Sequence, residues 1–362
     1  MSAEPSVSEA WGTPLQVYYC PHCHSAHLAP ASITLDTCPA CLQAGISPET
    51  AHLRRELPEL VISFGVERQR AQDLLTEWAK GGWFRPDEMR AELLSIRLRP
   101  YYFPVWLIDC DVEAVWQAEM GYDYQAASFR ERYQGGQWVS EQTTETRVRW
   151  EPRTGRLKRH YENVAVRAME AHDAWMSRMG GYDFGRRKPY APQAIDRSVV
   201  RVPDYAPEAA WPDAEQALSR TATLECKSAS QADHVRNWSM GARTYGLTWT
   251  QMLVPAYLTW YREGDEPHPV WINGQSGHVH GHKYASQRKA RMTSLVAGGL
   301  AAVFFLIGML LALIGSIDAA LVSLGVLMVI SALALGLSAP IPAIWAWLRN
   351  RSLRTREERE LA

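Results

Sequence analysis

The stretch CPHCHSAHLAPASITLDTCPAC, from Cys20 to Cys41, places two Cys-x2-Cys pairs on either side of fourteen residues. Two residues between cysteines let both thiolates of a pair bind one ion from a tight turn, and two such turns complete a tetrahedron. Four sulfur ligands in a closed site favour structural zinc over catalytic zinc. We therefore expect Cys20, Cys23, Cys38 and Cys41 to hold one Zn²⁺ in a zinc ribbon over residues 14–46, where the metal replaces a hydrophobic core.

The other cysteines and the nearby histidines are given lesser roles. Cys110 and Cys226 are isolated and are expected to be buried thiols. The first twenty residues contain acids and prolines but no apolar run, so we expect no export signal and a reducing compartment without disulfides. Three histidines, His22, His24 and His27, could replace a ligand, although four cysteines need no help.

The charge of the ribbon segment argues against nucleic-acid binding. Residues 1–60 carry two basic and six acidic side chains, and four thiolates on one divalent ion add further negative charge. Binding to phosphates depends on Lys and Arg side chains that displace counterions. We therefore expect the ribbon to dock a protein or to be purely structural, although the chain as a whole has a net charge of only −1.

The other end of the chain is strongly apolar. Leu295–Gly315 is an uninterrupted apolar run of 21 residues, about 31 Å long as a helix, which matches the hydrocarbon layer of a bilayer. Ala319–Ala339 is equally long, and only residues 316–318 separate the two runs. We predict a transmembrane helical hairpin over residues 295–348. The alternative, two buried helices of a soluble domain, is disfavoured because neither run has a polar face.

Basic side chains flank the predicted hairpin: Lys283, Arg288, Lys289 and Arg291 precede it, and Arg349 and Arg351 begin a basic tail over residues 349–362. Lys and Arg remain on the cytoplasmic side of a membrane, so both termini are expected in the cytoplasm and Asp318 on the far side. The six basic residues are expected to contact anionic lipid at the inner membrane, with a nucleic-acid patch as the alternative for the first four.

The sequence pattern of residues 58–287 predicts a cytoplasmic α+β body with an antiparallel, β-rich sheet and a few helices. Apolar residues at helical spacing predict a helix after Glu67 that Gly81 and Gly82 stop. Aromatic and β-branched residues predict a strand over residues 97–119. Alternating residues on both sides of Pro152–Gly155 predict a hairpin that turns there. Tyr101–Leu107 (YYFPVWL) matches Met252–Leu258 (MLVPAYL), which favours two related β units.

A last hairpin is expected to turn at Asn273–Gly274 or at Ser276–Gly277. His278, His280 and His282 follow it, and alternate residues of a strand share a face, so three imidazoles could form a second metal site. No Asp, Glu or Cys joins this cluster in the nearby sequence. A solvated strand edge is therefore the simpler interpretation.

The chain lacks the sequence motifs of several enzyme classes. It contains no G-x4-GK-[ST] phosphate loop, no G-x-S-x-G elbow and no H-E-x-x-H motif. The first absence counts against a helicase or another P-loop ATPase. We expect a non-enzymatic protein, with two alternatives: a metal-dependent hydrolase that uses the 278–282 histidines, and a membrane-tethered nucleic-acid-binding protein.

The order of these parts resembles a family of bacterial membrane proteins with a transcription-factor-IIB-type zinc ribbon, sometimes mislabelled as primosomal helicase-like. After the ribbon, the resemblance is carried by VISFGV (61–66), LLTEW (74–78), YYFPVWLID (101–109), RWEPRTG (149–155), KPYAPQ (188–193) and INGQSGHVHG (272–281). It spans nearly the whole chain. Two departures are Pro-Ala-Tyr at Pro255, where Pro-x-Trp is expected, and Ser276, where Thr is expected.

The resemblance implies a non-enzymatic scaffold or adaptor that recruits cytoplasmic proteins to the inner membrane. Proteins of this family are linked with flotillin-like (SPFH) proteins and with phage-shock-type coat proteins that remodel membranes during envelope stress. These partner classes are implied by the resemblance alone.

Overall fold

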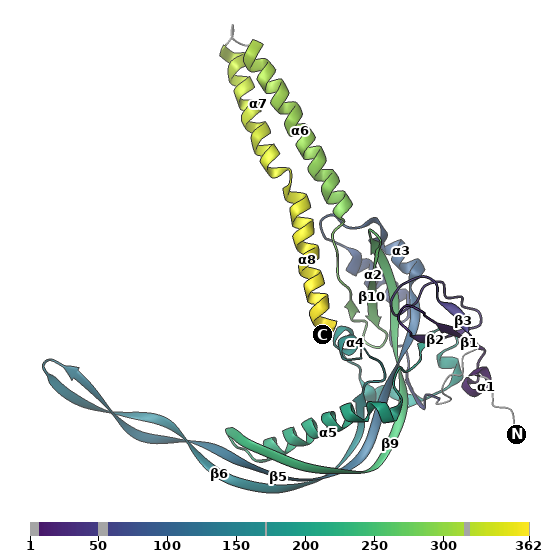
Figure 1. Ribbon diagram of the computed structural model, residues 1–362, viewed down its shortest axis with the longest axis vertical. Helices are drawn as coiled ribbons and strands as arrows, with labels where there is room; N and C mark the ends of the chain where they lie inside the picture. Colours follow the sequence, from purple (N-terminus) through teal and green to yellow (C-terminus); the bar gives the residue numbers. More distant parts are fainter. Residues whose placement is uncertain (1–6, 50–56, 171, 315–318, 362) are drawn as a thin grey trace. The chain divides into compact units, whose positions relative to one another are not determined.

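The computed structural model describes residues 7–49, 57–170, 172–314 and 319–361. The chain divides into two compact units. The first contains Met1–Pro104, Ala171–Val202 and Leu253–Ala362, and the second contains Val105–Glu170 and Pro203–Met252. Each unit is therefore assembled from segments that are distant in the sequence. The fold is mixed α+β, with a large, mostly antiparallel sheet and two apolar C-terminal helices (Figure 1).

One strand order, β11-β10-β9-β5-β8-β2-β1-β3, runs through the sheet. The strands are β1 (Leu15–Tyr19), β2 (Ala26–Pro30), β3 (Ser47–Glu49), β5 (Arg99–Gln134), β8 (Val199–Arg201), β9 (His234–Glu263), β10 (Glu266–Asn273) and β11 (Val279–His280). Two further strands, β4 (Leu60–Ile62) and β7 (Arg187–Pro189), pair with each other, and β4 also pairs with β9.

The four-cysteine segment is built into this sheet. β2 pairs antiparallel with β8, with His27 opposite Arg201 and Leu28 opposite Val200. On its other side, β8 pairs in parallel with β5, with Tyr101 opposite Val199. The strands that carry the cysteine turns are therefore an extension of the main sheet.

Four short helices belong to the first unit: α1 (Val7–Trp11), α2 (Arg68–Ala79), α3 (Ala91–Arg97) and α4 (His172–Met179). Three 3-10 helices accompany them at Asp87–Met89, Phe184–Arg186 and Pro192–Ala194. The helix predicted after Glu67 is confirmed as α2, whose Leu75 packs against Tyr257 and Tyr261 of β9. Gly81 and Gly82 follow its end with φ of +77° and +95°, which favour glycine.

The second unit is organised by a long antiparallel hairpin of β5 and β6 (Gln137–Val166), which turns at Gly135–Gly136 (Figure 1). Helix α5 (Pro207–Ala229) packs its small apolar side chains on the base of this hairpin, where Ala214 and Leu218 meet Ile108 and Cys110. Small side chains allow the helix to approach the sheet closely, so this contact forms the core of the unit.

Charge supports the pairing of the two strands of the long hairpin. Over residues 111–123, the charged side chains of β5 are all acidic, whereas those of β6 over residues 147–159 are mainly basic. Glu113 lies 2.8 Å from Lys158, and Asp111 lies 2.9 Å from His160 on the facing strand. Exposed ion pairs contribute little stability, but opposite charges on the facing strands favour the pairing of β5 with β6.

The turn predicted at Pro152–Gly155 is wrong. These residues lie within β6, opposite Trp116–Glu119 of β5. A Cβ atom at Gly155 would lie 2.6 Å from the Trp116 ring, so the glycine makes room for a cross-strand aromatic side chain instead of a turn. Pro152 is tolerated because β6 pairs with β5 alone among the described strands.

Three helices form the C-terminal part: α6 (Gln287–Ile314), α7 (Ala319–Ser338) and α8 (Ile341–Leu361). Two helical spans, Gln287–Ile314 and Ala320–Arg359, are long and apolar enough to cross a membrane, and most of their side chains are exposed. Pro340 follows the end of α7, where a proline cannot supply the helical N–H. The basic tail is helical as part of α8, whereas Asp318 lies outside the described residues.

Two glycines set the crossing of α6 and α7. A Cβ atom at Gly308 would lie 2.9 Å from the carbonyl oxygen of Gly325, and one at Gly325 would lie 2.7 Å from that of Gly308. The backbones therefore touch at this point, as is common where small residues face each other between membrane helices.

A valine at this crossing is expected to force the two helices apart. We predict that Gly308→Val destabilises the hairpin by about 1–3 kcal/mol, which is typical of overpacking, and lowers the melting temperature of the detergent-solubilised protein. Gly299→Val is the matched control, because an added Cβ there meets no atom within 4 Å. Equal melting temperatures for the two variants would contradict the crossing.

Candidate metal centre

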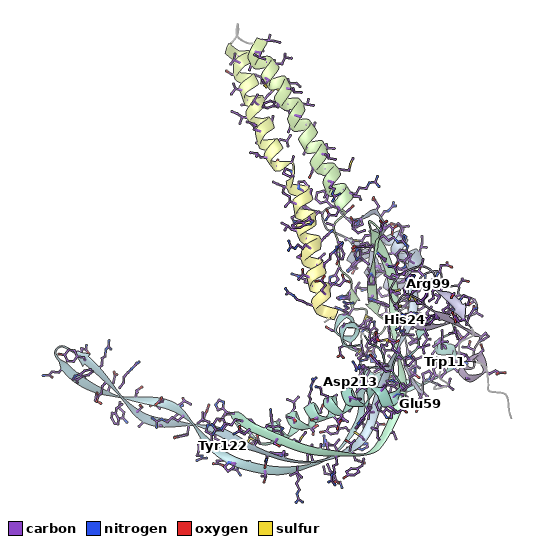
Figure 2. The ribbon with its side chains drawn as sticks, in the orientation of Figure 1. Trp11, His24, Glu59, Arg99, Tyr122 and Asp213 are labelled. Atoms are coloured by element: carbon purple, nitrogen blue, oxygen red, sulfur yellow. The ribbon has the colours of Figure 1, made fainter. Side chains whose placement is uncertain are left out.

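The two cysteine turns share one backbone conformation. In the first, the N–H of His24 donates to the carbonyl oxygen of Cys20 at 2.9 Å, and in the second Leu42 donates to Cys38 at 2.8 Å. His24 and Leu42 both adopt left-handed backbone angles, with φ of 57° and 60°. The repeated Cys-Pro-x-Cys sequence therefore folds into two equivalent turns (His24 is labelled in Figure 2).

These turns bring all four sulfur atoms within 4.8 Å of one another. The Sγ atoms of Cys20 and Cys41 are 3.6 Å apart, and so are those of Cys23 and Cys38. Four sulfurs around zinc at about 2.3 Å would be separated by roughly 3.8 Å, so the spacing fits a tetrahedral ion. The cluster can hold a metal ion such as zinc, as the sequence predicts.

The protein surroundings shift the pKa values of these thiols in different directions. Burial raises the pKa of Cys38 and of Cys41. Burial also opposes ionisation of Cys23, but hydrogen bonds with Ser25 and the neighbouring thiols lower its pKa to about 7. A bound divalent cation favours the thiolate at every ligand, so metal binding and thiol deprotonation are linked.

His27 is the buried neighbour of the cluster. Its Nε2 atom lies 2.9 Å from the hydroxyl of Ser25 and 3.6 Å from the Sγ of Cys38. Burial, and secondly the charge of Arg201, hold its pKa well below the usual histidine range, so the ring is neutral at pH 7. The sequence presents His27 only as a substitute ligand. In contrast, His24 is bonded to the hydroxyl of Tyr19 at 2.6 Å and is not among the four clustered ligands.

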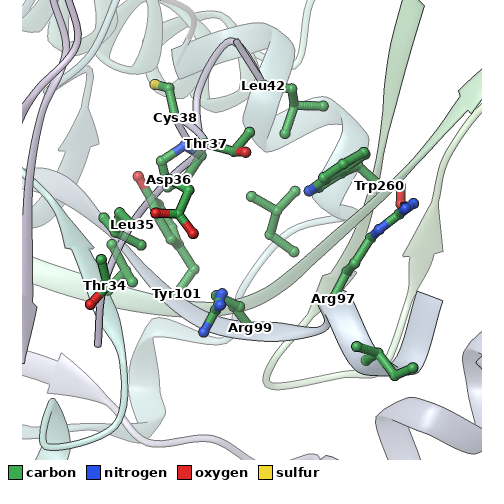
Figure 3. A pocket seen from close by; sticks show the side chains of 14 residues that line it. Thr34, Leu35, Asp36, Thr37, Cys38, Leu42, Arg97, Arg99, Tyr101 and Trp260 are labelled. Carbon is green, nitrogen blue, oxygen red and sulfur yellow. Dashed lines mark hydrogen bonds between the residues drawn. The ribbon is translucent and has the colours of Figure 1, made fainter. Parts of the chain in front are cut away.

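A cavity of about 250 Å³ lies beside the second cysteine turn (Figure 3). Ribbon residues Leu35, Asp36 and Leu42 line one part of it, and Ile96 and Trp260 line another. Arg97 stacks over the Trp260 ring at 4.1 Å, and Ile96 is 75% exposed. The sequence gives no signal for this cavity, because its lining comes from segments more than fifty residues apart.

The three histidines near the last hairpin do not come together as a metal site. The ring centroids of His280 and His282 are 5.4 Å apart, whereas the ring of His278 lies against Gly180. Within the described ranges, the four cysteines are the one group whose ligand atoms are close enough to hold an ion. The last hairpin turns over residues 274–277, and Gly277 has a φ of +82°.

The six basic residues next to the apolar C-terminal helices differ in their contacts. Lys283 donates to the carbonyl oxygen of Lys80 at 3.3 Å, and Lys289 lies 2.7 Å from a carboxylate oxygen of Asp87. The remaining four are arginines: Arg349 and Arg351 lie over Trp345 and Trp347, and Arg288 and Arg291 are exposed at the start of α6. Contact of these residues with lipid stays a prediction.

Comparison of the chain with protein-family models, with curated proteins and with solved structures gave no match. What the structure supports of the family resemblance is the four-cysteine cluster near the N-terminus. The family itself stays a prediction from the sequence motifs.

Metal analysis of the purified full-length protein tests the site. We expect one zinc per chain, and we expect Cys38→Ser to lose it because three sulfurs leave the tetrahedron incomplete. Cys226→Ser is the control, since that buried thiol lies on α5 in the second unit and is not among the four clustered cysteines. A full zinc content in Cys38→Ser would refute the assignment. A second ion that disappears in His280→Ala would identify a histidine site.

Proposed function

We propose that this protein is a membrane-anchored scaffold that binds one structural zinc ion in its ribbon and recruits cytoplasmic proteins to the inner membrane. Its anchor is the pair of apolar helices, α6 and α7, whose side chains are mostly exposed. Exposed apolar helices of this length are favourable in a bilayer, because lipid covers apolar surface whose exposure to water is unfavourable.

Contacts of α8 support a firm attachment between the anchor helices and the rest of the first unit. Asn350 pairs with the backbone of Ala285 through two hydrogen bonds of 2.8 Å and 2.9 Å. The hydroxyl of Tyr284 donates to Glu357 at 2.8 Å, and Arg354 lies 2.7 Å from Glu266 of β10. Because α8 is fastened to the chain before α6, the body is held at the membrane by more than a single linker.

The observation that carries the recruiting role is the distal part of the long hairpin, residues 124–147, which we name the distal arm. None of its residues is buried (Figure 2). Two-stranded ribbons are marginally stable in water unless a further layer covers one face. An arm of this length therefore favours a partner.

The two faces of the distal arm differ in chemistry. Tyr133 lies opposite Trp138, with ring centroids 5.3 Å apart, and Phe129 projects from the same face. These three side chains are 60%, 70% and 68% exposed. The other face carries five of the arm's six charged residues, Arg130, Arg132, Glu141, Glu145 and Arg147, whereas Glu131 lies on the aromatic face. An aromatic face beside a charged one is typical of protein-binding surfaces.

The balance of charge makes nucleic acid a poor partner for this arm. Its three arginines are matched by three glutamates, so no basic stripe is available for phosphates. The partner classes to test first are flotillin-like (SPFH) proteins and phage-shock-type coat proteins, which the sequence resemblance implies.

Photocrosslinking in native membranes tests the recruiting role. We expect a photoreactive phenylalanine analogue in place of Trp138 to form an adduct with a second protein, and the same analogue in place of Glu141, on the opposite face, to form little or none. Mass spectrometry identifies the adduct. Adducts with lipid alone, or equal adducts from both positions, would contradict recruitment through the aromatic face.

A further inference from the structure

We infer that Ser25, His27 and Tyr101 form a hydrogen-bonded relay that holds the metal-binding sulfurs and connects them to the central strand β5. The inference rests on the proposed binding of a metal by the four cysteines. It gives a role to three buried polar residues that are not ligands, so they are positioning residues.

The distances make a continuous chain. The Tyr101 hydroxyl lies 2.6 Å from Nδ1 of His27, and Nε2 of the same ring lies 2.9 Å from the hydroxyl of Ser25. The Ser25 oxygen then lies 3.0 Å from the Sγ of Cys23 and 3.5 Å from that of Cys38. Each of the three residues is at most 1% exposed, so water does not compete for these bonds.

Metal binding fixes the direction of the two bonds nearest the sulfurs. A metal-bound thiolate can only accept, so the Ser25 hydroxyl must donate its proton to sulfur. The Ser25 oxygen therefore accepts from Nε2–H of His27. At the other side of the ring, Nδ1 lies 2.6 Å from the Tyr101 hydroxyl, which is placed to donate to it. With that donation, all three bonds point toward the sulfurs.

This arrangement explains why His27 does not serve as a ligand. Its Nε2–H is directed to Ser25, and the ring lies behind Cys38, with Nε2 3.6 Å from the sulfur. Besides Ser25, the backbone N–H of Ala40 donates to the Cys38 sulfur at 3.4 Å. Four thiolates on one divalent ion leave excess negative charge, which such donors stabilise. Residues of this kind commonly alter metal affinity by about 10–100-fold.

The relay also joins distant parts of the first unit. Ser25 and His27 belong to the ribbon, whereas Tyr101 lies on β5, 74 residues beyond His27. The strand β8 lies between β2 and β5 in the sheet and pairs with both. The side-chain relay therefore spans the same junction as the backbone ladder.

Zinc transfer from the full-length, detergent-solubilised protein to a chromogenic chelator tests this inference. Tyr101→Phe removes one oxygen atom that is three hydrogen bonds from the nearest sulfur along the relay, and Ser25→Ala removes the direct donor. We expect both variants to load one zinc and to release it about tenfold faster than the wild type. Tyr18→Phe is the matched control, because this buried ribbon tyrosine bonds to Gln16 and Ile33 instead.

A double variant separates a relay from independent structural effects. If Tyr101 acts through Ser25, the double variant should release zinc no faster than Ser25→Ala alone. A double variant whose acceleration equals the product of the two single-variant accelerations would overturn the relay. Cobalt substitution adds a spectroscopic measurement, with a shifted sulfur-to-cobalt charge-transfer band expected for Ser25→Ala. Release from Tyr101→Phe at the rate of Tyr18→Phe would also overturn the inference. Absence of metal from the wild type would overturn the metal site itself.

Discussion

The antiparallel pairing of β2 with β8 is the contact on which the organisation of the first unit depends. It places His27 opposite Arg201 and Leu28 opposite Val200, and β8 continues the ladder to Tyr101 and Tyr102 of β5. A four-cysteine ribbon usually folds around its metal as a small separate module. Here the strands beside the cysteine turns extend a larger sheet, and they share a core with Tyr102 and Leu253 of the long strands. Metal binding should therefore stabilise the neighbouring strands of the sheet as well as the four-cysteine segment.

The same sheet organises the other functional parts. β5 and β9 are neighbours in the sheet, and both continue into the second unit, where β5 pairs with β6 to form the long hairpin. The matching segments 101–107 and 252–258 lie on these two strands and are buried throughout. β10, next to β9, supplies Glu266 to the contact with α8. The four-cysteine segment, the long hairpin and the apolar C-terminal helices are thus all attached to strands of one sheet.

The sequence predicts the features that depend on local pattern. The spacing of Cys20, Cys23, Cys38 and Cys41 predicts the four-cysteine cluster, and each of the two turns forms within five residues. The apolar helices are equally local, since composition and length define them. The helix at residues 68–79 follows from its apolar spacing and the glycines after it.

Features that depend on distant residues could not be predicted from the sequence. The β2–β8 ladder joins residues more than 170 positions apart, and no local pattern marks it. From the sequence, His27 is interpreted as a substitute ligand, because nothing in the sequence indicates that Tyr101 lies beside it. Gly155 lies in a sequence typical of a turn, but in the structure it leaves space for the Trp116 side chain of the facing strand. Gly308 becomes distinct from the other helix glycines only when Gly325 is placed against it.

Hydrogen exchange of the full-length protein, with zinc bound and after chelation, tests the union of ribbon and sheet most directly. Amides of β8 and of the first residues of β5 should lose protection together with those of β1 and β2 when zinc is removed, because they belong to one cooperative ladder. Amides of α5, in the second unit, provide the internal reference. Faster exchange confined to residues 15–49 would contradict the account, since it would show that the ribbon unfolds alone.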